Sequence, residues 1–340
     1  HFDVSLAKCL LSFNDQDEDQ FKINLKFARS NLLNQLVASC TESYQTVYPL
    51  LIKLHMLNDI ETWFTAKDHD LKHLSKSMKV AESLTDYNLS SREPLLNLRR
   101  VLFDLGGLKK DVGDCWLNYA MLARKAKFYK TAKISVLEAQ RYPQLIDCHL
   151  ETAKLYWETG DQDQAIRMAK NAYASMDEQT RKNNRSAFEL RLQIIRWEQE
   201  KLLEPEKSLL EDFRQITEED EYWEEGYFHF ALLLDKVYEI KRSESAKKIN
   251  KAINDPSLDE RTRKKNLAKE IKNYFDYFDN YGKDLLESYG YTLFFGSKHM
   301  FHAVPRMLTI VFRLNKEFHG LKDKVSSKTF SKHYKDLLDI

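Results

Sequence analysis

The sequence predicts an all-α fold, a solenoid of stacked helical repeats. First, apolar residues recur with helical spacing along nearly the whole chain. Second, the 340 residues include only 9 Gly and 6 Pro, whereas an all-β fold needs turn residues about every 8–12 positions. Third, small residues repeat at a fixed interval. Because 43% of the residues are hydrophobic and 31% are charged, we expect a hydrophobic core beneath a charged surface.

The N-terminal part, residues 1–110, reads as helical repeats. Acidic residues open the segment from Asp15 to Ser39, as suits the positive end of a helix, and apolar residues follow at helical spacing. Further helices are predicted over Tyr44–Phe64, over 67–84, where the pattern is more polar, and from Ser91 to Leu105. Gly106 and Gly107 then end the helical pattern.

The middle part, residues 111–255, carries a repeat of alanines. Two stretches coincide at a shift of 33 residues, which pairs Ala120 with Ala153, Ala132 with Ala165, and Ala139 with Ala172. Small side chains let neighbouring helices approach to about 8–10 Å, so these alanines are interpreted as packing residues. Gly160 and Asp161 form the turn inside the second repeat. This length is typical of tetratricopeptide (TPR) repeats, so we expect a TPR/HEAT-like α-solenoid.

The rest of the chain continues in helices, predicted over 184–202, 206–215 and 221–240. Asp255-Pro256 separates them from the C-terminal helical segment, residues 256–340, which opens with a basic helix from Arg261. Gly290 and Gly296 flank the aromatic run Tyr291–Phe295, and a last helix covers about Pro305–Phe318. Because no Ser- or Pro-rich linker interrupts the chain, we expect one continuous array.

The charge balance and the cysteines exclude several classes of function. Net charge is +1, from 53 basic and 52 acidic residues, which gives no overall attraction to nucleic acid or to an anionic membrane. Cys9, Cys40, Cys115 and Cys148 stand singly, as expected of free thiols in a reducing compartment. No apolar run approaches the ~20 residues of a membrane span. The chain opens at His1 without a methionine, so we expect it to be part of a longer protein.

No catalytic, cofactor-binding or metal-binding motif is found, and the charged or aromatic clusters have ordinary interpretations. His69 and His73 could hold a metal, but their polar segment favours a solvated helix face. His299 and His302 are interpreted as a helix edge. The acidic run Thr217–Glu225 is interpreted as a helix N-terminus capped by Thr217, not as a carboxylate cluster. The basic run 261–272 favours a solvated face over a phosphate site. The aromatics of 291–295 favour core over a ligand pocket.

Four segments together resemble the FAT region of the phosphatidylinositol-3-kinase-related protein kinases. They are YPLLIKLHMLNDIE (48–61), REPLLNLRRVLFDL (92–105), the pair WLNYAMLARKA and ETAKLYWETGDQDQA (116–126 and 151–165), and GYFHFALLLDKVYE (226–239). Within this family the segment YGYTLFFGSKHMFHAVPRMLTIVF (289–312) is similar to the ATR branch, through Pro305, Arg306 and the residues that follow them. The intervening sequence is rich in Asp, Asn and Lys, which suggests a yeast-type ATR.

The resemblance implies the following about function. The parent protein would be a large nuclear serine/threonine kinase of the DNA-damage and replication-stress checkpoint. Its kinase domain, with ATP and magnesium, would lie beyond Ile340, so this chain would be a scaffold without catalytic residues. Its partners would be its own kinase domain, a second copy of the kinase and an ATRIP-type subunit. Neither a membrane nor direct contact with DNA is expected.

Within that scaffold, a set of residues is predicted to act by packing and to affect kinase regulation indirectly. The set comprises Trp116, Ala120, Ala132, Ala139, Ala153, Trp157, Gly160, Ala165, Ala172, Pro305 and Arg306. The alternative is a free-standing TPR adaptor that binds partner peptides, which a groove lined by Lys, Arg and Asn from successive first helices would favour. An enzyme in its own right would need convergent polar residues, and the sequence shows none.

Overall fold

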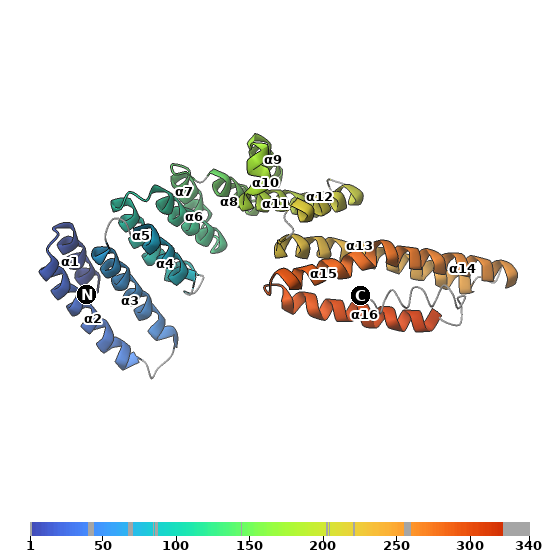
Figure 1. The fold of residues 1–340 in the computed structure, drawn as a ribbon, viewed down its shortest axis with the longest axis horizontal. Coiled ribbons are helices and arrows are strands. Elements are labelled where there is room, and N and C mark those ends of the chain that lie inside the picture. Colours follow the sequence, from blue (N-terminus) through green and yellow to red (C-terminus); the bar gives the residue numbers. More distant parts are fainter. Residues whose placement is uncertain are drawn as a thin grey trace. The chain divides into compact units, whose positions relative to one another are not determined.

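Helices account for every regular element in the residues that the computed structural model describes (Figure 1). These residues are 2–39, 44–66, 71–83, 88–143, 145–201, 205–219, 222–254 and 260–321, together with Thr85 and Leu203. The chain divides into two compact units, residues 1–181 and 182–340. The all-α class is therefore confirmed, whereas the continuous array expected from the lack of a linker is divided in two. The expected segment boundaries near residues 110 and 255 stay predictions.

The first unit begins with five helices. These are α1 (Phe2–Asn14), α2 (Glu18–Ser39), α3 (Tyr44–Thr65), α4 (Leu71–Ser83) and α5 (Leu89–Leu105). The sequence analysis predicted α2 to α5 but not α1. Helix α2 begins later than expected because Asp17 caps it, with its carboxylate accepting a hydrogen bond from the backbone N–H of Gln20 at 3.0 Å. Likewise Asn88, not Ser91, opens α5, and its side chain accepts the N–H of Ser91.

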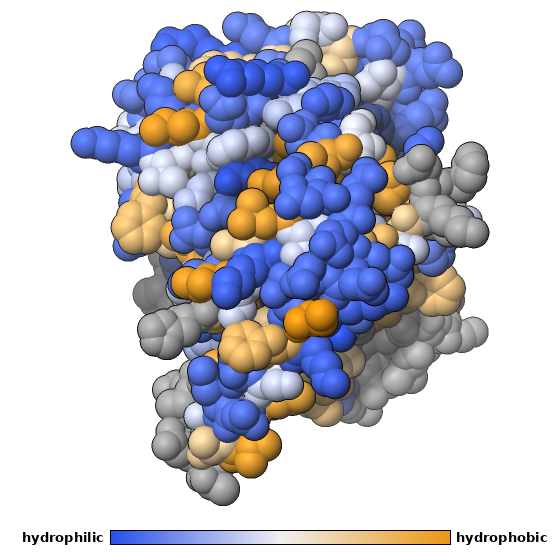
Figure 2. All heavy atoms as spheres, turned by 90° about the vertical axis from the view of Figure 1, so that its left-hand side faces the viewer, coloured by the Kyte–Doolittle hydropathy of each residue, from blue (hydrophilic) through white to orange (hydrophobic). Residues whose placement is uncertain are grey.

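The core of this part is built from the apolar positions that the helical period places inward. Phe21 of α2 stacks on Phe64 of α3, and Trp63 of α3 meets Phe103 of α5 edge-on. The opposite faces are charged. Figure 2 shows the face at the N-terminal end of this unit, where hydrophobic side chains emerge between hydrophilic ones without forming one continuous area. Such scattered apolar exposure is normal for a protein surface.

Two hairpins complete the first unit and correspond to the predicted repeat. Their helices are α6 (Lys109–Lys125) with α7 (Tyr129–Ala139), and α8 (Leu145–Glu158) with α9 (Gln162–Ser175). The short helix α10 (Glu178–Asn183) follows at the boundary between the units.

The turns that end α5, α6 and α8 share one geometry. Gly107, Lys127 and Gly160 have positive φ angles of 68°, 64° and 100°. In each turn the N–H of the next residue reaches back five positions, as from Phe128 to the Ala123 carbonyl at 2.8 Å. This is the left-handed C-terminal cap that favours glycine. Lys127 and Gly160 stand 33 residues apart, so the repeat includes the turn as well as the alanines.

The second unit is an aromatic-rich bundle. It contains α11 (Arg185–Lys201), α12 (Glu206–Glu219), α13 (Glu224–Asn254), α14 (Glu260–Tyr277), a π-helical turn η2 (Phe278–Gly282), α15 (Lys283–Phe295) and α16 (Met300–Leu321). Figure 1 shows α13, α14, α15 and α16 running alongside one another. Their shared core includes Trp223, Phe278 and Tyr289. The sequence analysis missed η2 and the length of α13.

Two local expectations need correction in this unit. Thr217 does not cap a helix N-terminus: it is buried in the last turn of α12, and its hydroxyl donates to the Arg214 carbonyl. Gly290 and Gly296 flank the aromatic run as described, with Gly290 inside α15 and Gly296 at its C-terminal end. The aromatics of 291–295 are not core. Phe294 is 81% exposed and Tyr291 is exposed as well.

Candidate functional site

The repeated alanines lie where the four hairpin helices meet. Ala120, Ala139, Ala153 and Ala165 are fully inaccessible, Ala132 nearly so, and Ala172 is also buried. Ala120 of α6 and Ala139 of α7 share one apolar cluster with Cys148 of α8. A methyl group at each position leaves room for the neighbouring backbone, which is what close helix packing requires. Their effect on the regulation of a kinase stays a prediction.

The two predicted tryptophans are half-buried and lie on the flanks of these hairpins. The guanidinium of Arg100, from α5, lies 3.6 Å from the centre of the Trp116 ring. Such a stack favours a flat cation, and partial burial lowers the pKa of Arg100. Trp157 occupies the last turn of α8, just before the turn that Gly160 permits.

A buried ion pair joins the two hairpins. Nε of Arg124, on α6, donates to Oε1 of Glu151, on α8, at 2.6 Å, and Glu158 also pairs with Arg124. Burial acts to lower the pKa of Arg124, but its hydrogen bonds to Glu151 raise the value overall. Arg124 and Glu151 both belong to segments that carry the family resemblance. Their contact could not be predicted from the sequence.

A second buried ion pair, which the sequence analysis missed, ties α3, α4 and α5 together. Arg99 is 1% exposed; its Nε lies 2.7 Å from Asp59 and its Nη1 lies 3.1 Å from Glu82. Burial raises the pKa of Asp59, and Arg99 acts against this rise. Pairing is what makes the burial of such charges tolerable, so these three residues fix how their helices meet. The only feature of the sequence that could have indicated this ion pair is Arg99 itself, a basic residue at a position of α5 that the helical period places inward.

In the second unit, a charged cluster holds α16 against α13. Arg306 makes two hydrogen bonds of 2.7 Å to the carboxylate of Asp235 and a third, also of 2.7 Å, to Glu239. Hydrogen bonding to Asp235 raises the pKa of Arg306. Arg242 of α13 pairs with Glu317 of α16 at 2.6 Å. Arg306 was predicted as a packing residue, and the structure gives it this ionic contact, whereas the described residues leave its neighbour Pro305 exposed.

One face of α16 is apolar and has no neighbour among the described residues. Phe301 is 87% exposed, and Val304, Leu308, Val311 and Phe312 emerge on the same side of the helix or next to it. The opposite face, with Ala303, Ile310 and Leu314, is buried in the core. A helix that is apolar on both faces needs a cover on each of them. The exposed ring of Phe294, at the end of α15, adds to the apolar surface of this unit.

The histidines do not form a metal site among the described residues. His73 is exposed on α4, and His69 lies outside the residues that the structure describes. His299 precedes α16 and stacks on Phe228 at 3.8 Å, with its Nε2 3.0 Å from Glu225, while His302 is exposed. Nowhere in the described part are three His, Cys, Asp or Glu side chains placed to hold a metal. Partial burial of His229 lowers its pKa to about 4.

The other sequence features fall as follows. Of the acidic run, Glu224 and Glu225 lie in the first turn of α13, while Asp220 and Glu221 lie outside the described residues. The described side chains of the basic run on α14 are mostly exposed. Cys9, Cys115 and Cys148 are buried free thiols; Cys40 is not described. No helix in the described ranges is long and apolar enough to cross a bilayer.

Comparisons with known proteins agree with this architecture. A family model described as "FAT domain" matches residues 1–309. The serine/threonine-protein kinase ATR of Arabidopsis thaliana is 28% identical over 353 residues, covering 92% of this chain and 13% of that protein. The serine-protein kinase ATM of Sus scrofa is 22% identical over 201 residues, or 53% of this chain and 7% of that protein. The chain therefore spans only a small part of these relatives.

Two solved structures share the fold. "FAT and kinase domain of CtTel1" superposes with a TM-score of 0.61 at 11% identity, covering 100% of this chain and 26% of that one. "Complete CtTel1 dimer with C2 symmetry" gives a TM-score of 0.58 at 12% identity, covering 97% of this chain and 14% of that one.

Proposed function

The chain belongs to the FAT domain family, and from this membership we propose that it is the helical scaffold of an ATR-like serine/threonine protein kinase. It supports and regulates a kinase domain that lies C-terminal to it in the parent protein. Likeness to an ATR kinase along most of the chain supports this choice, since the likeness to ATM covers a smaller part. The segment itself contributes no catalytic group; ATP and magnesium belong to the parent's kinase domain.

The unpartnered face of α16 carries the proposal. This face belongs to the last helix that the structure describes. Its exposed Phe301, Leu308 and Phe312 form an apolar surface on which another protein segment can pack. The pairing of Arg306 with Asp235 fixes this helix on α13. A partner that displaces α16 would therefore also displace α13. We propose that the remainder of the parent chain, with its kinase domain, packs on this face.

The finer parts of the proposal follow from the family. The parent protein works in the nucleus, in the DNA-damage and replication-stress checkpoint, with an ATRIP-type subunit. It forms a dimer to which this segment contributes, as supported by the likeness to a kinase described as a C2-symmetric dimer. A free-standing peptide adaptor is disfavoured, because the chain matches a FAT family model and spans only a small part of its relatives.

The test uses the full-length parent kinase. Leu308→Asp with Phe312→Asp places two charges on the exposed face of α16, where the fold of the bundle itself tolerates them. The control is Ile240→Asp, a comparably exposed aliphatic residue on α13. We expect kinase activity to fall at least about tenfold in the double variant and to stay within about twofold in the control, since a buried interface rejects an unpaired charge. Equal activity in both variants would refute the proposal.

A further inference from the structure

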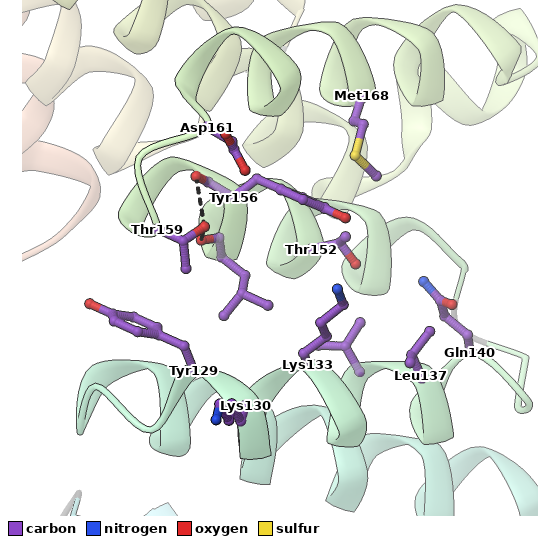
Figure 3. A pocket seen from close by; sticks show the side chains of 12 residues that line it. Tyr129, Lys130, Lys133, Leu137, Gln140, Thr152, Tyr156, Thr159, Asp161 and Met168 are labelled. Atoms are coloured by element: carbon purple, nitrogen blue, oxygen red, sulfur yellow. Dashed lines mark hydrogen bonds between the residues drawn. The ribbon is translucent and has the colours of Figure 1, made fainter.

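A cavity of about 480 Å³ opens between α7 and α8 in the first unit (Figure 3). Its floor is apolar, with Val136 and Leu137 of α7, Leu155 of α8 and Met168 of α9. Figure 3 shows Lys133 pointing from α7 into the space below Thr152 and Tyr156, with Tyr129 at one end. A volume of this size accommodates one or two large side chains.

The α7 wall of the cavity is positively charged. Lys130 and Lys133 both line it, and neither forms an ion pair with any residue that the structure describes. The one acidic residue of α7, Glu138, is already paired with Arg141. Asp161 stands on the far side, at the turn before α9 (Figure 3). The carboxylates of a partner would therefore align along α7 and away from α9.

The cavity continues onto an exposed apolar surface. Ile134 and Leu137 are both more than half exposed on the outer face of α7, beside the two lysines, and Phe128 is exposed just before the helix. The apolar pocket, its aliphatic flanks and the two lysines together form a surface larger than a small molecule would cover. A nucleic-acid backbone would use the cations and leave the apolar floor unfilled.

We propose that the cavity between α7 and α8 binds an acidic peptide segment that carries a bulky aliphatic or aromatic side chain. The apolar side chain enters the cavity over Leu155 and Met168, and the flanking carboxylates pair with Lys130 and Lys133. This site lies between the second helix of one hairpin and the first helix of the next. It is therefore distinct from a groove lined by successive first helices, and it does not depend on the proposed kinase function.

The experiment measures fluorescence anisotropy of the whole 340-residue chain with a labelled peptide, Glu-Asp-Glu-Leu-Phe-Glu-Asp-Glu. Lys130→Glu with Lys133→Glu reverses the charged wall, and Leu137→Ser removes an apolar contact. The matched control, Lys72→Glu with Lys76→Glu, makes the same charge change on exposed positions of α4. Circular dichroism verifies that every variant keeps its helices.

We expect the wild-type chain and the α4 control to bind equally, and the Lys130/Lys133 variant to bind at least about tenfold more weakly, because two attractive pairs become repulsive. Leu137→Ser and a peptide with serines in place of Leu and Phe should each lose several-fold. The proposal is overturned if the wild type does not bind, or if the α4 control weakens binding equally. It is also overturned if the serine peptide binds as well, or if duplex DNA of equal charge displaces the peptide, since either result indicates an unspecific polyanion surface.

Discussion

Arg124 and Glu151 bind each other inside the first unit, 27 residues apart in sequence, with Nε of the arginine 2.6 Å from the carboxylate. Both side chains are buried, and they connect the first helices of successive hairpins. In a stack of repeats each unit contacts only its neighbours, so this pair sits at the contact through which one hairpin constrains the next.

Replacing Glu151 by Gln should destabilise the chain by about 3 kcal/mol, because it removes the more buried of the two carboxylates that neutralise the guanidinium of Arg124. The matched control is Glu158→Gln, which removes the more exposed of the two carboxylates and should cost about 1 kcal/mol or less. Urea unfolding followed by circular dichroism measures both. Equal losses in the two variants would mean that burial does not set the strength of this pair.

Replacing Ala132 by Leu should cost about 1–3 kcal/mol, since the contact between α7 and its neighbours has no room for a larger side chain. Ala174→Leu, on an exposed position of α9, is the control and should change stability little. Thermal unfolding measures stability, and kinase assays of the parent measure activation. Normal folding together with normal activation of the Ala132 variant would contradict the packing role predicted for the alanines.

Two Gly→Ala substitutions should have opposite signs. Gly160 has a φ of 100°, so Gly160→Ala should lose about 1–2 kcal/mol through backbone strain, although nothing lies within 4 Å of an added Cβ. Gly290 lies inside α15 with equally open space, and Gly290→Ala should gain about 0.5–1 kcal/mol by helix propensity. If both substitutions shift the urea midpoint in the same direction, the positive φ of Gly160 does not determine the effect of Gly160→Ala on stability.

Stability should fall as the pH drops from 6.5 to 5, because burial lowers the pKa of His229 to about 4. The unfolded chain takes up this proton near pH 6.5 and the folded chain does not, so protonation favours unfolding throughout this window. At pH 5 the loss should reach about 2 kcal/mol. His229→Gln should remove most of this slope in urea unfolding at several pH values, whereas an unchanged slope would assign it to other groups.

Local features of this fold could be predicted from the sequence. Helix positions follow from the 3.6-residue period, and Gly107 and Gly160 end their helices because only glycine adopts a positive φ without strain. The alanine pattern located the hairpins because a repeated small side chain reports a repeated close contact. The sequence analysis failed at chain ends and caps, such as α1 and Asn88, where a few residues decide the outcome.

The sequence by itself determined an array of helices, its repeated seam and its family. Only the tertiary structure decided which charges meet: Arg99 with Asp59, and Arg306 with Asp235, lie 40 and 71 positions apart. It also decided that the aromatic Phe294 faces outward and that Lys130 and Lys133 border an apolar cavity. The physical reason is that period and composition fix what each helix face contains, whereas the placement of neighbouring helices fixes which face is covered.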